Sequence, residues 1–137
     1  MFLSILSNNE REDFLNLAIN MAHIDGDFAN AEKVQINAYA LEMGLMLKDK
    51  SAYSKTNDEL ITELSKSNIA TKKAIFAEII ALALVDGIHS TEEELLNTMQ
   101  IKFDLDNKFK QDLTDWYGQI LPLYRRGYEL VGIGGVI

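Results

Sequence analysis

The sequence predicts an all-α fold, a compact helical bundle of about six to seven helices built from two helix-bend-helix repeats. Three observations lead to this class. Proline occurs once and glycine is rare before residue 118, so little interrupts helix formation. Alternating runs of β-branched residues, which are typical of strands, are missing from the sequence. An apolar run that ends in Asp-Gly and is followed by a glutamate occurs at Asp25 and again 61 positions later at Asp86.

The spacing of these features predicts one domain over all 137 residues, of which 47% are hydrophobic. We expect the first repeat at about 9–47 and the second at about 70–106. A C-terminal helix and an apolar tail then occupy 107–137. The repeats therefore make up most of the predicted core.

The first repeat has clear helix boundaries. Ser7 can cap a helix that runs to about Ile24, because Glu10 stands three residues later and completes a capping box. A second helix is predicted over Asn30–Met43, where Gly44 supplies a left-handed stop. These two helices flank the first Asp-Gly bend.

The middle of the chain contains a polar connection and the most hydrophobic helix. Residues 48–57 are rich in Lys, Ser and Asn and predict a surface connection, followed by a short helix over 58–65. Thr71 is the predicted cap of a helix over 72–85 that is apolar nearly all round and hence central to the core. Within it, we expect Glu78 to occupy an exposed spot.

The second repeat closes with a helix that starts at a capping box of Ser90 and Glu93 and runs to about Phe103. Asp106 can cap a last helix that extends towards Leu121. Pro122 lacks an amide hydrogen, so we expect this helix to kink or break just before it.

The C-terminal tail is rich in glycine and apolar residues, which disfavours a regular helix. Arg125, Arg126 and Tyr128 concentrate side chains that are common in interfaces, and they are the candidate partner-binding residues. The tail could contact an anionic membrane surface peripherally, or a second copy of the chain in a homodimer.

The two bends supply the candidate metal ligands, which are Asp25, Asp27, Glu32, Asp86 and Glu93. Carboxylate oxygens are the ligands of hard divalent cations, and the shared offset would bring the two sets together. The alternative is purely structural, because Asp-Gly ends a helix and a glutamate in the next first turn suits the helix dipole. Both interpretations stay open.

A standard twelve-residue calcium loop is excluded at either bend. When the glycine is placed sixth, the first ligand position falls on Met21 in one copy and on Leu82 in the other. Apolar side chains cannot coordinate calcium. Any divalent cation would therefore be bound by oxygen ligands in another arrangement.

The repeated phrase resembles the TerB-like family, which is associated with tellurite resistance and also occurs as the N-terminal part of a membrane-linked co-chaperone. The resemblance covers about residues 10–120. It implies a compact all-α bundle of two such halves. It also implies that acidic residues at the bends, here Asp25, Glu32, Asp86 and Glu93, are metal-binding or interaction sites.

Composition limits the function further. The net charge of −8 repels a phosphate backbone and favours a basic protein surface or a cation over nucleic acid. The lack of cysteine excludes a thiolate zinc site, and the presence of only two histidines, His23 and His89, disfavours a histidine-based zinc site. The N-terminus does not read as a secretory signal and no apolar run is long enough to span a bilayer, so we expect a cytoplasmic protein.

These observations predict a non-enzymatic interaction or sensing module of the TerB-like type, in a bacterial stress-response or tellurite-resistance system. A divalent cation at the acidic bends is its candidate mechanism. The alternative is an acidic inhibitor or immunity-type protein that neutralises a basic toxin or enzyme by charge complementarity. The sequence shows no arrangement of residues that would form a catalytic pair.

Overall fold

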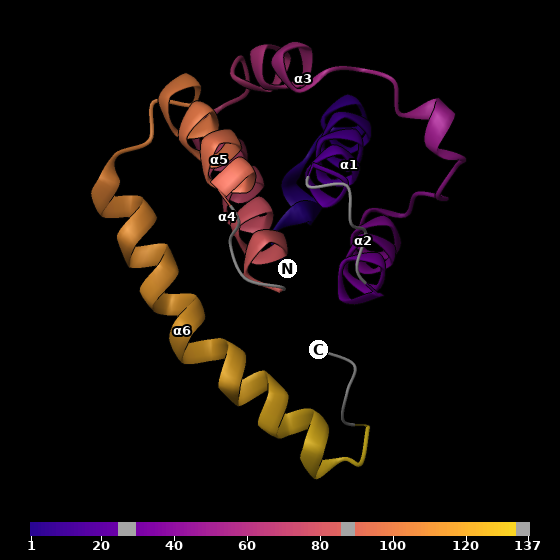
Figure 1. The fold of residues 1–137 in the computed structure, drawn as a ribbon, viewed down its shortest axis with the longest axis vertical. Helices are drawn as coiled ribbons and strands as arrows, with labels where there is room; N and C mark the ends of the chain where they lie inside the picture. The colour runs from indigo at the N-terminus through magenta and orange to yellow at the C-terminus, as the bar shows by residue number, and fades with distance from the viewer. Residues whose placement is uncertain (25–29, 86–89, 134–137) are drawn as a thin grey trace.

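The computed structural model describes residues 1–24, 30–85 and 90–133, and within these ranges the chain is all-helical with no strand (Figure 1). The prediction of an all-α bundle is therefore confirmed. The described elements, in chain order, are the 3₁₀ turn η1 (Leu3–Ile5), α1 (Asn8–Ala22), α2 (Asn30–Met43), the 3₁₀ turn η2 (Lys50–Ala52), α3 (Asn57–Leu64), α4 (Ile69–Leu84), α5 (Ser90–Lys102) and α6 (Asn107–Leu130).

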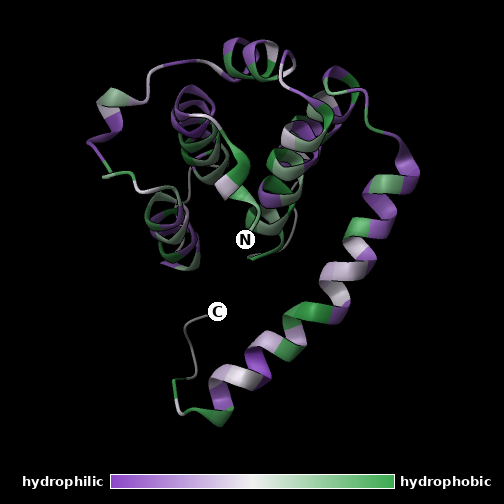
Figure 2. Cartoon of the chain, turned by 180° about the vertical axis from the view of Figure 1, so that it is seen from behind, coloured by the Kyte–Doolittle hydropathy of each residue, from purple (hydrophilic) through white to green (hydrophobic). Residues whose placement is uncertain are grey.

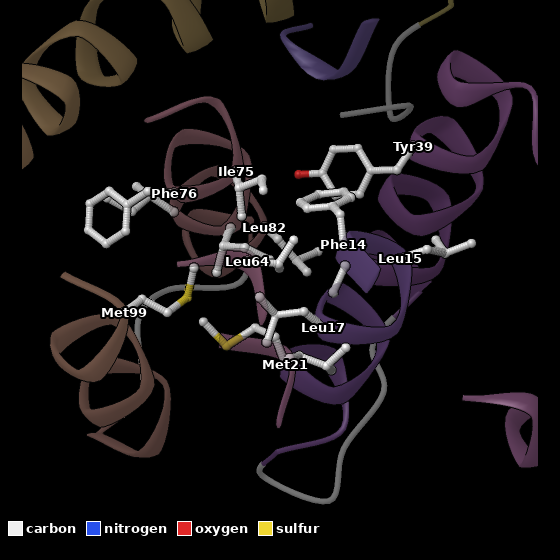
Figure 3. Packing of buried hydrophobic residues seen from close by; sticks show 14 of the residues in the cluster. Phe14, Leu15, Leu17, Met21, Tyr39, Leu64, Ile75, Phe76, Leu82 and Met99 are labelled. Atoms are coloured by element: carbon white, nitrogen blue, oxygen red, sulfur yellow. The ribbon is translucent and has the colours of Figure 1, made fainter. Parts of the chain in front are cut away.

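Helices α1 and α4 form the centre of the bundle. Helix α1 packs against α2, α3 and α4, and α4 also packs against α5 and α6. Figure 3 shows the resulting core, in which Phe14 and Met21 of α1 lie near Leu82 of α4, and all three side chains are at most 1% exposed. Burying a side chain of this kind stabilises the fold by roughly 1.5–3 kcal/mol. The apolar faces of the two repeats thus share one core.

The helix boundaries of the first repeat agree with the sequence. The Ser7 hydroxyl accepts from the Glu10 amide, and the Glu10 carboxylate accepts from the Ser7 amide, so the capping box is present. Although burial raises the pKa of Glu10, hydrogen bonds from the Ser67 hydroxyl and from Ser7 hold that pKa below its usual value. Gly44 ends α2 with a φ of 70°.

The predicted caps of the second repeat are wrong by a few residues. Helix α4 begins at Ile69, because the Asn68 side chain accepts a 2.8 Å hydrogen bond from the Thr71 amide and is the actual cap. Thr71 is buried inside the first turn instead. Helix α5 already includes Ser90, so Ser90 is not the residue before the helix.

Helix α6 continues through Pro122 to Leu130, so the predicted break is wrong, and the part of the predicted non-helical tail up to Leu130 is helical. Residues 134–137 of the tail lie outside the described residues. Pro122 removes the amide that would bond the carbonyl of Gly118, and Gly118 is exposed, where water can replace that bond. Gly127 also lies within the helix. The helix ends where Gly132 adopts a φ of 78° and the Ile133 amide bonds the Tyr128 carbonyl at 3.0 Å.

The two ends of α6 have different surroundings. Phe109, Leu113 and Trp116 in the first half pack against the core, whereas the second half extends beyond the body of the bundle (Figure 1). Figure 2 shows that hydrophobic residues nevertheless continue along the whole length of this helix. This exposed second half is the largest departure of the molecule from a closed bundle.

Candidate functional site

The acidic residues of the two bends are only partly within the described structure. Asp25, Asp27 and Asp86 lie outside the described residues. Glu32 is the third residue of α2 and is 2% exposed. Its side chain has an interaction partner. Glu93 accepts a 2.7 Å hydrogen bond and ion pair from the Lys110 ammonium of α6. Among the residues that the structure describes, no three His, Asp or Glu side chains are grouped to hold a metal ion.

The residue of the second repeat that corresponds in position to Glu32 is Glu92, not Glu93 as the sequence suggested. Glu92 is the third residue of α5, as Glu32 is of α2, and it is also 2% exposed. Glu93 is half-buried beside it. The buried carboxylates in the first turns of α2 and α5 are therefore Glu32 and Glu92, 60 positions apart, although the aspartates of the bends are 61 apart.

The ends of α2 and α5 confirm the 60-residue offset. Gly44 and Asp104 both adopt left-handed backbone, with φ values of 70° and 55°. In each case the next residue is a leucine whose amide reaches back to the helix, from Leu45 to the Ala40 carbonyl at 2.8 Å and from Leu105 to the Gln100 carbonyl at 2.9 Å. Aligning the sequence on these helix ends, instead of on Asp-Gly, would have identified Glu92.

Glu78 is another buried carboxylate, and the expectation that it is exposed was wrong. It is 3% exposed and accepts a 2.9 Å hydrogen bond from the Phe2 amide, while the Met1 ammonium lies 2.9 Å away. Burial lowers the pKa of that ammonium, but the hydrogen bonds and charges of Glu42 and Glu78 raise it above its usual value. Glu42 also accepts from the Leu3 amide at 2.9 Å. These contacts use Glu78 to hold the N-terminal segment.

Two buried tyrosines attach α2 and α6 to consecutive carbonyls of α4. The Tyr39 hydroxyl of α2 donates to the Glu78 carbonyl at 2.6 Å, and the Tyr117 hydroxyl of α6 donates to the Ala77 carbonyl at 2.8 Å. Burial, with the nearby Glu78 charge, raises the pKa of both hydroxyls well above the usual value. Both therefore remain protonated donors. Both have a structural role, since Tyr39 fixes α2 to α4 and Tyr117 fixes the first half of α6 to α4.

The predicted partner-binding residues lie on the exposed second half of α6. Arg125 and Arg126 are exposed, and Arg126 makes a 3.7 Å ion pair with Glu129 on the same helix. Tyr128 is half-buried and lines an apolar groove of about 470 Å³, which we call the distal groove. The distal groove is lined by Ile120, Leu123, Tyr124, Gly127, Tyr128, Val131 and Ile133.

An acidic cleft of about 490 Å³ lies between α1 and α3. Its lining carboxylates are Glu12, Asp13, Glu59 and Glu63, and Asn9, Lys55 and Leu60 complete it. The Lys55 ammonium forms a 2.8 Å ion pair with Asp13, which is itself buried. The carboxylates of Glu12, Glu59 and Glu63 are exposed in the cleft, and Glu63 also forms a 2.9 Å ion pair with Lys66.

The only histidine within the described residues makes a structural contact. His23 follows the end of α1, and its Nδ1 lies 2.9 Å from the Ile19 carbonyl, so this nitrogen carries the proton and donates. His89 lies outside the described residues. No helix of the described structure combines the length and the apolar character needed to cross a membrane. Comparisons with protein-family models, with curated proteins and with solved structures found no match to this chain.

Proposed function

We propose that this chain is a non-enzymatic interaction module of the TerB-like type, acting in a bacterial stress-response or tellurite-resistance system, and that it docks a protein partner along the second half of α6. One observation carries the proposal. The apolar side of α6 packs against the core as far as Ile120 and Leu121, and within the described residues exposed apolar side chains then continue to Val131.

The exposure of these residues is costly unless a partner covers them. Leu123 and Val131 are 70% and 69% exposed, and both line the distal groove with Tyr124 and Tyr128. Monomeric proteins rarely expose contiguous apolar surface of this kind, and tyrosines beside aliphatic side chains are common in interfaces. The groove therefore supports a docking role.

The charge beside the groove indicates the chemistry of the partner. Arg125 and Arg126 are adjacent and exposed, whereas the chain as a whole carries a net charge of −8. We infer that the partner presents an amphipathic helix, with apolar side chains for the groove and acidic side chains for the arginines.

Selection of helical peptides from a randomised display library tests this function. We expect the selected peptides to carry an apolar stripe flanked by Asp or Glu. Their binding should weaken at least about tenfold with Leu123→Asp, because a charge would then be buried in the groove. Leu41→Asp is the matched control, since Leu41 is 83% exposed on α2. Peptides with basic flanks, or equal losses in the two variants, would contradict the proposal.

The measured mass of the isolated protein separates a protein partner from a second copy of the chain. We expect a monomer by light scattering, because copies with a net charge of −8 repel each other. A dimer that dissociates with Leu123→Asp would assign the groove to self-association and would overturn the inferred acidic partner.

The acidic cleft favours a second candidate function, an acidic inhibitor that binds a basic toxin or enzyme. Glu12, Glu59 and Glu63 are exposed in one cleft between two helices. A lysine-rich helical peptide is the probe. Its affinity should fall steeply with salt and stepwise with Glu59→Gln and Glu63→Gln, but not with Leu123→Asp. Salt-independent binding would count against this function.

The cation mechanism stays a prediction. It requires carboxylates of the bends, of which Glu93 is already paired with Lys110. Calorimetric titration of metal-stripped protein with Ca²⁺, Mg²⁺, Mn²⁺ and Zn²⁺ tests it. Saturable binding that disappears in the double variant Asp25→Asn/Asp86→Asn would establish the site. Heats of dilution alone for all four ions would remove metal from the mechanism.

A further inference from the structure

A small pocket of about 260 Å³ lies where the end of α1, the first turns of α2 and the α2–α3 connection meet. The connection runs along one side of the molecule, away from α6 (Figure 1). The pocket thus shares no residue with the distal groove or with the acidic cleft. The two proposed partner-binding surfaces do not involve this pocket.

The floor of the pocket is apolar. Ile19, Ile36 and Tyr53 are buried, and Leu47 forms a partly exposed wall. The Lys48 amide donates a 3.0 Å hydrogen bond to the Tyr53 hydroxyl, which fixes the connection across the pocket. A ligand in this position would bury a short apolar body. The volume of the pocket is slightly below the roughly 300–1,000 Å³ of most ligand pockets, which limits the ligand to a short molecule.

The rim of the pocket is basic, in contrast to the protein as a whole. Lys33, Lys48 and Lys50 line it, and none of its described lining residues is Asp or Glu. Four lysines elsewhere in the described structure form ion pairs with carboxylates, for example Lys55 with Asp13 and Lys110 with Glu93. The ammonium groups of Lys48 and Lys50 make no ion pair within the described ranges, so both can bind an added anion.

We propose that this pocket is a binding site for a small amphipathic carboxylate, whose short hydrocarbon body contacts Ile36, Leu47 and Tyr53 and whose carboxylate is bound by Lys48 and Lys50. An apolar floor provides affinity, and a few charged groups at the rim provide orientation and selectivity. Lys48 and Lys50 line the pocket and form no ion pair in the part of the chain that the structure describes, so their positive charges favour an anionic ligand at this position.

Titration of the ¹⁵N-labelled protein with sodium hexanoate, followed by amide chemical shifts, tests the site. We expect saturable shifts confined to the amides around Leu47, Lys48 and Tyr53. Uncharged 1-hexanol should bind the same amides about fivefold more weakly, because it lacks the contact with the lysines. Hexylammonium, with the opposite charge, should bind more weakly still.

Variants separate the charge from the apolar floor. Lys48→Met/Lys50→Met keeps the apolar stems and should abolish the preference for hexanoate over hexanol. Lys72→Met/Lys102→Met changes the net charge equally outside the pocket and should preserve the preference. Leu47→Asn should weaken both ligands. The proposal is overturned by shifts that do not saturate, by shifts centred elsewhere, or by equal affinity for hexanoate and hexanol.

Discussion

Arg11 connects three separate parts of the backbone, and its replacement provides a sharp test of the fold. Its Nε donates to the Leu6 carbonyl at 2.9 Å, and its two terminal nitrogens donate to the Ser4 and Met43 carbonyls, both at 3.1 Å. Met43 is the last residue of α2, so the guanidinium also caps the carboxyl end of that helix. One side chain thus fixes the N-terminal segment against both α1 and α2.

The effect of Arg11→Met follows from these three hydrogen bonds. A hydrogen bond to a charged group contributes about 1.5–3 kcal/mol when buried, but the Arg11 side chain is only half-buried. Taking about 1 kcal/mol for each bond, we expect the variant to lose about 2–3 kcal/mol of unfolding free energy. Urea unfolding followed by circular dichroism at 222 nm measures this loss. The slope of the transition should be unchanged.

Arg11→Lys is the matched control for charge. Lysine keeps the positive charge, but its single ammonium lacks the planar fork that reaches three carbonyls. We expect this variant to recover less than half of the loss. Wild-type stability in Arg11→Lys, or a loss below about 0.5 kcal/mol in Arg11→Met, would show that the three hydrogen bonds do not hold these segments together.

Three further outcomes are expected. Because the pKa of Glu10 is lowered in the folded state, the wild type should be more stable than Glu10→Gln above the ordinary pKa of 4.5. The urea midpoints of the two proteins should converge as the pH falls through the folded-state pKa. A difference between the midpoints that widens in acid would contradict the assignment. Gly44→Ala should lower the free energy of unfolding by about 1 kcal/mol, whereas Asp104→Gly should leave it unchanged or raise it, because only glycine adopts a positive φ without strain. Equal losses of stability in thermal unfolding would refute the conclusion that α2 and α5 end in the same way. Tyr117→Phe should lose about 1 kcal/mol and leave the helical content unchanged by circular dichroism, since one buried hydrogen bond is removed; an unchanged melting temperature would count against that bond.

Local signals in the sequence were sufficient to predict much of the fold. The capping box of Ser7 and Glu10 and the glycine stop at Gly44 each depend on residues only a few positions apart, and the structure contains both. The cap of α4 was misplaced because Asn68 and Thr71 are both good capping residues, and the choice between them depends on burial of Thr71 by the rest of the fold.

Features that depend on tertiary packing could not be predicted in this way. A glutamate in an apolar helix gives no sign that a distant amide, here that of Phe2, will satisfy it, so Glu78 was assigned to the surface. Pro122 was expected to break α6, but its effect depends on whether water reaches the Gly118 carbonyl. Glu92 was missed because the two bends were aligned on their aspartates, although the following helices differ by one position.

The tyrosine contacts on α4 have a mechanical consequence. Tyr117 of α6 and Tyr39 of α2 are attached to carbonyls of neighbouring residues, Ala77 and Glu78, within one turn of the same helix. A force on the C-terminal end of α6 would therefore reach α4 next to the carbonyl that bonds Tyr39 of α2. A partner that displaces α6 would also disturb the neighbouring contact between α4 and α2, which belongs to the first repeat.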